Sequence, residues 1–408
     1  MNRFDVAVVG GGPVGGYVAG KIASSGYRTA IFEEHNKIGE PLRCAGLVSP
    51  RIFDLVDVGQ TNIVQNKIYG ANIYSPSGNV LTIGGDRVHA LVVNRSTLDE
   101  SLVNSAREKG VEVFLGSRIS YGRKKEDFIE LDVIKDKRVN QTECLLLIGA
   151  DGSGSPVRDL FGFPQPNEML RSIGAEVANV DLDPRFVEIF LGRSIAPGFF
   201  AWIIPLNKHG SEARIGLCVE NKSKHLLKQC FLNLLKTRQL QNAGILRYIG
   251  GSIPLGPLKK TTQSNVMLVG DAAAQVKPTS GGGVYPGLVC ARCCASVAVE
   301  ALDEKDIGGR FLSRYHRLWS KEIGKELSLG MRFRGFFRNL DDEQIDKILN
   351  VLGNEKSVEV IGEYGDIDYP SKLVFPLLKA CPSLLKFLPS VFKFRKSSFY
   401  FDDGGGGT

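Results

Sequence analysis

The chain has 408 residues, of which 43% are hydrophobic and 23% are charged, the ordinary balance of a globular protein that buries a core. Its formal net charge of +7 suits phosphates, acidic partners or an anionic membrane surface, whereas no compact basic motif with interleaved aromatic residues supports nucleic acid as a partner. The sequence has neither a secretory signal nor a continuous apolar run of about eighteen residues, so we expect a cytoplasmic protein.

The N-terminal region has the pattern strand, glycine turn, helix, strand. Residues 4–9 are apolar and rich in β-branched side chains, which predicts a buried strand. The turn Gly10-Gly11-Gly12-Pro13-Val14-Gly15 follows, then a helical pattern over residues 16–24 and a second strand over residues 29–32. This order is typical of a Rossmann-like dinucleotide-binding unit.

The glycines and the acid after the second strand indicate the ligand. Gly10 permits a tight turn, Gly12 admits a pyrophosphate, and Gly15 lets the helix pack closely on the strand. Glu33 lies eighteen residues after Gly15, where the pattern requires an acid to bind ribose hydroxyls. Because a carboxylate repels a 2′-phosphate, the sequence predicts FAD or NAD rather than NADP.

Two later apolar strands each end in an aspartate turn. Residues 145–149 lead into Asp151, and residues 266–269 lead into Asp271. Either segment alone also fits an ordinary strand and turn. The three segments in this order resemble the FAD-dependent aromatic hydroxylase-like flavoprotein superfamily. The resemblance implies FAD as cofactor, with Asp271 at the ribityl chain and Asp151 near the diphosphate; Val14 belongs to the same cofactor-binding turn.

A glycine loop at residues 281–283 precedes a helical pattern over residues 286–302. Glycines allow the backbone to lie against a flat ring, and a helix N-terminus stabilises an anionic reduced flavin. By the same resemblance, Gly283 and Val284 supply backbone contacts to the flavin.

A narrower resemblance lies in residues 39–47. Pro41-Leu42-Arg43-Cys44-Ala45-Gly46 is similar to the Pro-x-x-Cys-x-Gly segment of geranylgeranyl reductases, including the archaeal digeranylgeranylglycerophospholipid reductases. The match implies that Cys44, Ala45 and Gly46 contact the cofactor, and that Cys44 acts as a proton donor or redox partner. Cys44 also fits a small buried residue.

Three further positions are candidates. Tyr285, next to the glycine loop, is a weaker candidate for the catalytic acid. The resemblance implies that Arg95 contacts FAD and that Ile119 makes a backbone contact on the adenosine side. Arg95 equally fits an ordinary arginine at a helix start.

Residues 197–205 resemble the Pro-x-x-Tyr-x-Trp-x-Phe-Pro motif of the same reductases, with Phe200 in place of Tyr and Ile204 in place of Phe. Both replacements keep an apolar wall, and Phe200 lacks the tyrosine hydroxyl. An aromatic and aliphatic surface suits a prenyl chain, although the segment also fits an ordinary core strand. The expected substrate-binding residues are Phe199, Phe200, Trp202, Ile204 and Pro205.

We expect an α/β fold with a Rossmann-like FAD-binding domain, an antiparallel-sheet substrate domain and a C-terminal helical region. The substrate domain should contain a hairpin around residues 75–78, which joins the antiparallel sheet, and a helix near residues 223–238. The expected boundaries are 1–62, 93–165 and 255–305 for the FAD-binding domain, 63–92 and 166–254 for the substrate domain, 306–403 for the helices, and 404–408 for a flexible tail.

Residues 372–396 contain recurring lysines, apolar side chains and prolines but no acidic residue. This composition fits either peripheral contact with the inner face of an anionic cell membrane or a helical cap with a solvated basic face. No metal site is expected, because the one cysteine cluster, Cys290, Cys293 and Cys294, has no second pair at zinc spacing and fits small buried residues on a helix.

The predicted reaction is saturation of geranylgeranyl double bonds, and two alternatives remain open. In this hypothesis the substrate is a prenylated membrane glycerophospholipid, hydride comes from reduced FAD, and an acid or water supplies the proton. The electron donor is expected to be ferredoxin, a reduced nicotinamide or a reduced deazaflavin. The alternatives are an FAD-dependent monooxygenase of an aromatic or polyene substrate and a non-catalytic prenyl-lipid carrier.

Overall fold

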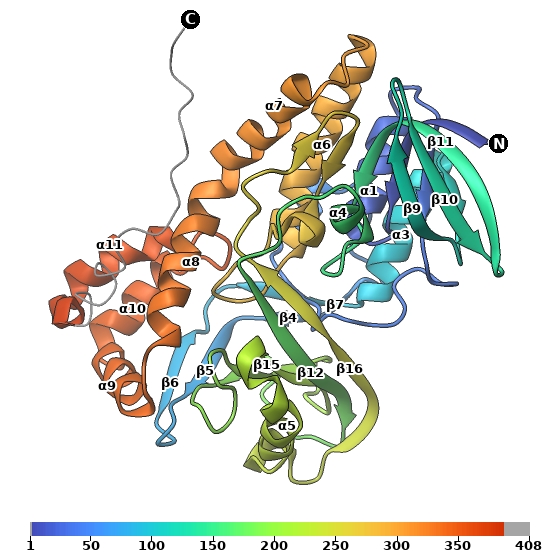
Figure 1. Cartoon of the computed structure of the whole chain (residues 1–408). Coiled ribbons are helices and arrows are strands. Elements are labelled where there is room, and N and C mark those ends of the chain that lie inside the picture. The colour runs from blue at the N-terminus through green and yellow to red at the C-terminus, as the bar shows by residue number, and fades with distance from the viewer. Residues whose placement is uncertain (1, 387–408) are drawn as a thin grey trace, which may run out of the picture.

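Three sheets and the surrounding helices make up residues 2–386, the part of the chain that this computed structural model describes (Figure 1). The largest sheet has the order β17-β18-β11-β1-β2-β8, and the hairpin β9–β10 joins it along β11. Its strands are β1 (Asn2–Val9), β2 (Thr29–Phe32), β8 (Glu112–Phe114), β9 (Arg118–Lys124), β10 (Ile129–Lys135), β11 (Arg138–Gly149), β17 (Thr262–Gln263) and β18 (Val266–Leu268). Strands β18, β11, β1, β2 and β8 are parallel, so their carboxyl ends meet at one edge.

Helix α1 (Pro13–Ala23) packs against β1, β2 and the helices α3 (Arg95–Glu108) and α6 (Val284–Asp303). The sequence predicts its start near Gly16, but the helix begins three residues earlier. Proline is well suited to the first helical position, where its missing N–H would have no partner, and the N–H of Gly16 already donates to the carbonyl of Gly12 at 2.9 Å.

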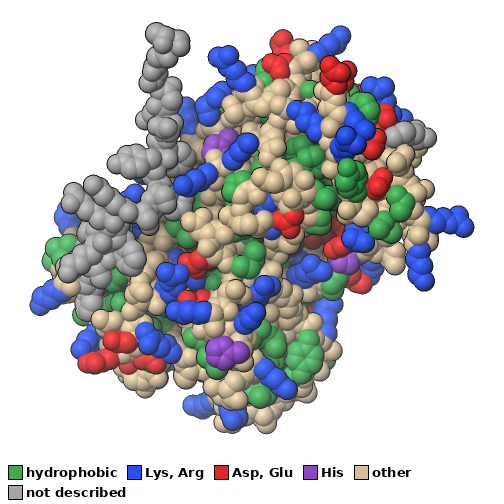
Figure 2. All heavy atoms as spheres, in the orientation of Figure 1, with side chains coloured by type: hydrophobic (Ala, Val, Ile, Leu, Met, Phe, Trp, Pro, Cys, Tyr) green, Lys and Arg blue, Asp and Glu red, His purple; other side chains and the backbone are tan. Residues whose placement is uncertain are grey.

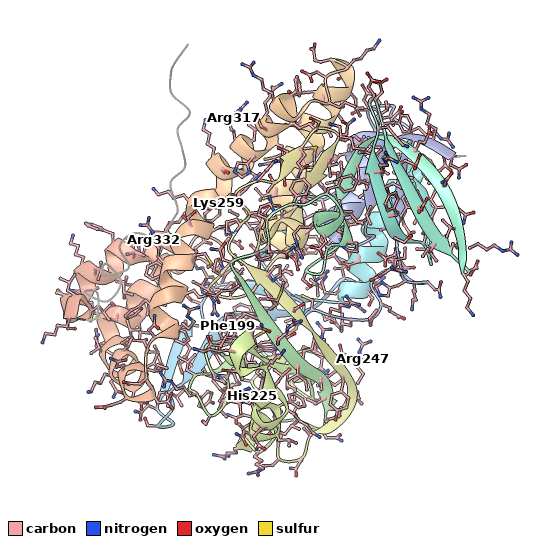
Figure 3. The ribbon with its side chains drawn as sticks, in the orientation of Figure 1. Phe199, His225, Arg247, Lys259, Arg317 and Arg332 are labelled. Carbon is pink, nitrogen blue, oxygen red and sulfur yellow. The ribbon has the colours of Figure 1, made fainter. Side chains whose placement is uncertain are left out.

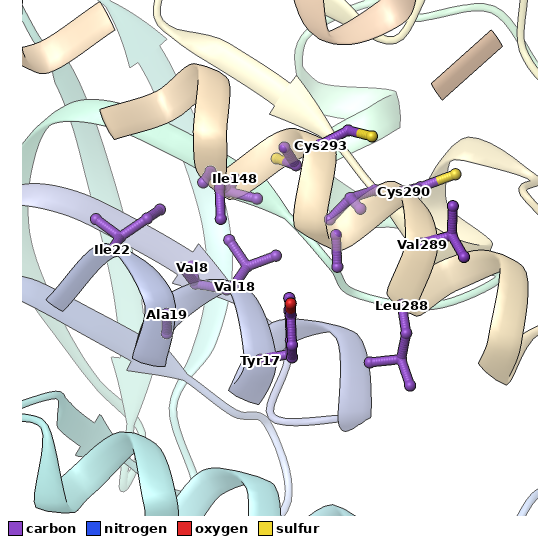
Figure 4. Close-up of a cluster of buried hydrophobic side chains, with 14 of the residues drawn as sticks. Val8, Tyr17, Val18, Ala19, Ile22, Ile148, Leu288, Val289, Cys290 and Cys293 are labelled. Carbon is purple, nitrogen blue, oxygen red and sulfur yellow. The ribbon is translucent and has the colours of Figure 1, made fainter. Parts of the chain in front are cut away.

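Helix α6 is a core helix. It is long and apolar enough to cross a membrane, but 78% of that apolar window is buried inside the protein. Cys290 and Cys293 lie in the same buried cluster as Val8 and Tyr17 (Figure 4), and burial raises the pKa of Cys293 to about 12. The helix begins at Val284, two residues before the predicted start.

The second sheet has the order β16-β12-β15-β14-β13-β5-β6. Neighbouring strands in this sheet are antiparallel, except that β5 and β13 run parallel. A parallel pair needs a long connection, and the chain between these two strands is long enough to provide it. The predicted hairpin near residues 75–78 is confirmed as β5–β6. The strands are β5 (Gly70–Tyr74), β6 (Val80–Gly84), β12 (Glu168–Ala178), β13 (Phe186–Phe190), β14 (Ala201–Pro205), β15 (Glu212–Glu220) and β16 (Gly244–Leu255).

Shorter elements connect these sheets. A small sheet, β3-β7-β4, lies between the two larger ones (Figure 1). Helix α5 packs on β12 and β15, near the position predicted for a helix. The elements are β3 (Leu47–Val48), β4 (Val64–Ile68), β7 (Ala90–Val93), α2 (Ile52–Leu55), α4 (Pro156–Leu160), α5 (Leu227–Leu235), and the 3-10 turns η1 (Asn221–Leu226), η2 (Arg238–Leu240) and η3 (Gly270–Ala273).

The C-terminal part is helical; its first helix packs on α6, and later helices pack on β6 (Figure 1). It contains α7 (Gly309–Trp319), the π-helical turn η4 (Ser320–Gly324), α8 (Lys325–Arg338), α9 (Asp342–Leu352), α10 (Glu355–Tyr364), α11 (Ser371–Ala380) and η5 (Pro382–Lys386). The predicted fold class is confirmed. The exact domain boundaries stay a prediction, and the tail at 404–408 lies outside the described residues, as does the end of the amphipathic segment beyond residue 386.

Candidate functional site

A cavity of about 770 Å³ lies between the carboxyl edge of the parallel sheet and the inner face of the second sheet. Sites for small molecules and cofactors usually have volumes of about 300–1,000 Å³. The wall of the cavity is formed by the glycine turn, residues 39–47 and the start of α6, together with parts of β12, β14 and β16. Phe199 marks its position in the interior of the molecule (Figure 3).

Three of the four glycines in the turn, Gly10, Gly12 and Gly15, differ in what surrounds them. A Cβ atom on Gly10, whose φ is +102°, would lie 2.4 Å from the carbonyl oxygen of Ala150, and one on Gly15 would lie 2.0 Å from that of Gly10. A Cβ on Gly12 would meet no protein atom within 4 Å. Gly10 and Gly15 therefore permit close packing within the protein, whereas Gly12 leaves space on the cavity side.

Glu33 is held firmly beside this turn. Its Oε2 accepts a hydrogen bond from the N–H of Gly11 at 2.7 Å, and its Oε1 accepts one from the N–H of His35 at 2.9 Å. Because β2 ends directly before Glu33, the strand places the carboxylate at the cavity wall. A carboxylate in this position after the second strand can accept hydrogen bonds from ribose hydroxyls.

Asp271 follows β18 and faces the first turn of α6. A Cβ on Gly283 would lie 2.6 Å from its Oδ1, so a glycine is needed where the helix begins. Burial raises the pKa of Asp271, and the positive charge of Arg95 opposes that rise. The N-terminal end of α6 thus meets a carboxylate at the cavity wall.

Asp151 organises the turn after β11. Its Oδ1 accepts a hydrogen bond from the hydroxyl of Ser155 at 2.6 Å, and its Oδ2 accepts one from the N–H of Val157 at 2.8 Å. Burial raises the pKa of Asp151 to about 6, although these hydrogen bonds oppose the rise. The side chain therefore fixes the loop and lines the cavity.

The Cys44 segment is held by a buried arginine that the sequence analysis did not identify. Arg214 on β15 donates from Nη1 to the carbonyl of Ala45 at 2.9 Å, from Nε to Glu176 at 2.9 Å and from Nη2 to Gln65 at 3.0 Å. A Cβ on Gly46 would lie 2.2 Å from that Nη1. A single arginine within the apolar strand 213–219 was the signal for this role.

The aromatic segment forms one wall of the cavity. Phe199 and Phe200 stack with ring centroids 4.4 Å apart, and Trp202 meets Phe200 edge to face at 6.1 Å. Arg334 of α8, also unrecognised in the sequence, lies over the Phe199 ring at 5.2 Å and donates to the carbonyl of Gly198 at 3.0 Å. The C-terminal helices thus brace this wall.

Most of the predicted site residues meet at this cavity, and a few do not. Tyr285 does not line it, and its hydroxyl lies 3.0 Å from that of Tyr369. Gly15 and Pro205 support the wall without lining it. The residues that line it are Gly10, Gly12, Val14, Glu33, Cys44, Ala45, Gly46, Arg95, Ile119, Phe199, Phe200, Trp202, Ile204, Asp271, Gly283 and Val284.

Strand β16 also contributes to the wall, although the sequence suggested no role for it. Its residues 249–253 line the cavity, and Gly250-Gly251 is the signal, because paired glycines in a strand often mark a close approach. Lys277 is a further lining residue; its Nζ donates to Asp368 at 2.9 Å.

The residues present fit an FAD molecule. The open side of Gly12 leaves room for a diphosphate at the N-terminus of α1, and the Glu33 carboxylate at the cavity wall can accept hydrogen bonds from ribose hydroxyls. Asp271 and the glycine loop lie at the same cavity, next to the aromatic wall. The cavity thus offers separate polar and apolar surfaces.

Comparisons with known proteins agree with this geometry. The family model described as FAD binding domain matches residues 3–228, more than half of the chain, and the model described as lycopene cyclase protein matches residues 217–353. The match to an FAD binding domain confirms the predicted cofactor.

Similar proteins come from archaea of several genera. An uncharacterized protein of Methanocaldococcus jannaschii is 34% identical, covering 93% of this chain and 96% of its own length. Digeranylgeranylglycerophospholipid reductase 2 of Methanothermobacter thermautotrophicus is 31% identical, covering 91% and 98%. The crystal structure of a geranylgeranyl bacteriochlorophyll reductase-like protein from Thermoplasma acidophilum shares the fold, with a TM-score of 0.86, 22% identity and coverage of 96% and 100%. The chain therefore contains an FAD binding domain and belongs to the digeranylgeranylglycerophospholipid reductase family.

Proposed function

We propose that the protein is an FAD-dependent reductase that saturates double bonds of geranylgeranyl chains on archaeal-type membrane glycerophospholipids. The observation that carries this proposal is the composition of the cavity. A dinucleotide-binding turn and an aromatic wall line the same space, with the Cys44 segment as part of its wall. The names of the related reductases support the same substrate class.

The apolar wall suits the chemistry of an isolated alkene. Such a bond has little electrophilicity, so the protein must hold it flat and keep water away. Phe199, Phe200 and Trp202 supply rigid surface for this purpose, and Ile204 extends it. When bound and reduced, FAD supplies the hydride.

The proton is the second requirement. Cys44 lines the cavity, and its Sγ lies 3.4 Å from the N–H of Gly46. We propose that the Cys44 thiol, or a water beside it, delivers the proton to the alkene. Tyr285 does not line the cavity and its hydroxyl contacts that of Tyr369, which makes this side chain the weaker candidate.

The residues proposed to bind FAD lie in the glycine turn, after β2 and at the start of α6. We propose contacts with the diphosphate from Gly12 and Val14, with a ribose from Glu33 and with the ribityl chain from Asp271. Gly283 and Val284 then lie against the flavin ring. Arg95 is a supporting residue, because both its Nε and Nη2 donate to Asp99, at 3.1 and 3.0 Å.

The first experiment is mass spectrometry of a prenyl phospholipid extract incubated with the FAD-loaded protein and dithionite. Mass gains in steps of two hydrogens are expected. Dithionite can then be replaced by ferredoxin, a reduced nicotinamide or a reduced deazaflavin to identify the donor. A protein that binds reducible FAD yet leaves the lipid unsaturated would contradict the proposal, and oxygen uptake would then test the monooxygenase alternative.

A further inference from the structure

The lower end of the molecule, formed by η1, α5 and the first half of β16, carries more positive than negative charge, although Lys222 pairs with Glu220 and Arg247 with Glu176. Residues 221–270 contain no aspartate or glutamate, whereas residues 222–247 contain Lys222, Lys224, Lys228, Lys236, Arg238 and Arg247. Figure 2 shows blue and green side chains at this end, with hardly any red. His225 and Arg247 mark its two sides (Figure 3).

Large apolar side chains are exposed among these cations. Leu246 and Tyr248 on β16 are 60% and 67% exposed, and Leu232 on α5 and Ile245 on β16 are exposed as well. The ring of Tyr248 lies 6.2 Å from that of Phe231, so β16 and α5 form one continuous surface. Exposed apolar side chains surrounded by cations are typical of proteins that bind the interface of an anionic bilayer.

This surface leads directly to the cavity. Strand β16 continues from the exposed Tyr248 to Ile249, and residues 249–253 line the cavity wall. A lipid that entered beside β16 would pass from the exposed surface to the aromatic wall without crossing the rest of the molecule.

The C-terminal helices are less suited to an anionic membrane. Phe375 of α11 is exposed, but Lys372 pairs with Asp366, and α9 and α10 contribute further carboxylates. Both surfaces thus contain ion-paired cations, but α9 and α10 carry acidic residues of their own and residues 221–270 carry none, so the excess of positive charge is larger at the lower end.

We propose that residues 222–248 form the membrane-docking surface, with an anionic phospholipid bilayer as the occupant, and that substrate enters along β16. This inference rests on the proposed function for the identity of the substrate. Binding to a bilayer can nevertheless be measured without a prenyl lipid, so the two proposals can fail separately.

The test is co-sedimentation of the FAD-loaded protein with vesicles of phosphatidylglycerol and phosphatidylcholine, compared with phosphatidylcholine alone. Wild-type protein should sediment only with the anionic vesicles, and high salt should release it. Each lysine near such a surface strengthens binding roughly fivefold, so the triple variant Lys224→Gln, Lys228→Gln, Lys236→Gln should bind at least about tenfold more weakly.

The double variant Leu246→Ser, Tyr248→Ser tests the apolar contribution and should also weaken binding at least about tenfold. The matched control Tyr121→Ser, Val139→Ser removes exposed apolar side chains from β9 and β11 and should leave binding unchanged. All three variants should reduce detergent-dispersed prenyl lipid at the wild-type rate, because none of these side chains lines the cavity.

Two results would overturn the proposal. If Lys372→Gln, Lys379→Gln, Lys386→Gln abolishes sedimentation while the α5 and β16 variants retain it, the C-terminal helices form the docking surface. If the wild-type protein does not bind anionic vesicles, the cations face an acidic protein instead. The lysine variant keeps the test decisive even where the double variant folds poorly.

Discussion

Glu176 is shared by two arginines that differ in burial. Arg214 is 2% exposed and Arg247 is 49% exposed, and both donate to this carboxylate. Arg214→Met leaves buried partners without a donor, so we expect the free energy of unfolding to fall by about 3–5 kcal/mol. The matched variant Arg247→Met should cost at most about 1 kcal/mol because solvent screens the exposed pair. Denaturant unfolding measures both losses, and equal losses would contradict the assigned role of Arg214.

Asp151 predicts a pH dependence of stability. Its pKa of about 6 lies above the ordinary aspartate value of about 4. Between these values the folded protein keeps a proton that the unfolded chain has released, so this residue makes the free energy of unfolding fall as pH rises from about 4 to about 6. Asp151→Asn should remove that fall. Thermal unfolding of cofactor-free protein across this range checks it, and identical slopes for variant and wild type would contradict it.

At the scale of elements, substitutions at two glycines should affect cofactor binding and substrate binding separately. A Cβ on Gly12, at the start of α1, meets no protein atom, whereas one on Gly216 of β15 would lie 2.6 Å from the Trp202 ring on the paired strand β14. Gly12→Ala should weaken FAD binding at least about tenfold without lowering stability, since one methyl group in a tight site has effects of this size.

Gly216→Ala should have the opposite pattern. Displacement of the Trp202 ring should lower the rate of prenyl reduction about tenfold or more, with FAD affinity within twofold of wild type. Flavin fluorescence titration and reduction of a soluble prenyl substrate measure the two properties. If both variants affected FAD binding alike, the division of the cavity into two surfaces would be wrong.

At the scale of the whole molecule, residues 366–369 tie the C-terminal helices to the cavity. The Asp368 side chain is fully buried and pairs with Lys277 at 2.9 Å and Arg51 at 3.0 Å. Asp368→Asn removes the charge that both cations share, so we expect a loss of about 3 kcal/mol or more in stability and faster proteolysis between α10 and α11. Glu343→Gln, which breaks only the exposed pair with Lys347, is the control and should change little.

The sequence predicted those parts of the site whose residues lie close together along the chain. Gly12 and Glu33 are separated by one helix and one strand, so their relative position follows from local patterns. Arg214 reaches Ala45 across 169 residues of chain, and Lys277 reaches Asp368 across 91, so no local pattern names either partner, although an arginine within an apolar strand marks position 214 as special. The contact of Tyr285 was unpredictable for the same reason, because its partner Tyr369 belongs to the distant C-terminal segment.

The cavity wall draws on residues from Val9 to Ile367, and this has a consequence for synthesis. The glycine turn leaves the ribosome early, but Ala150 and Asp271, which complete its surroundings, are translated much later. A nascent chain that ends before α6 would carry the dinucleotide motif without a finished site. We therefore expect FAD to bind only after translation is nearly complete, so that its binding stabilises the finished protein and not the nascent chain.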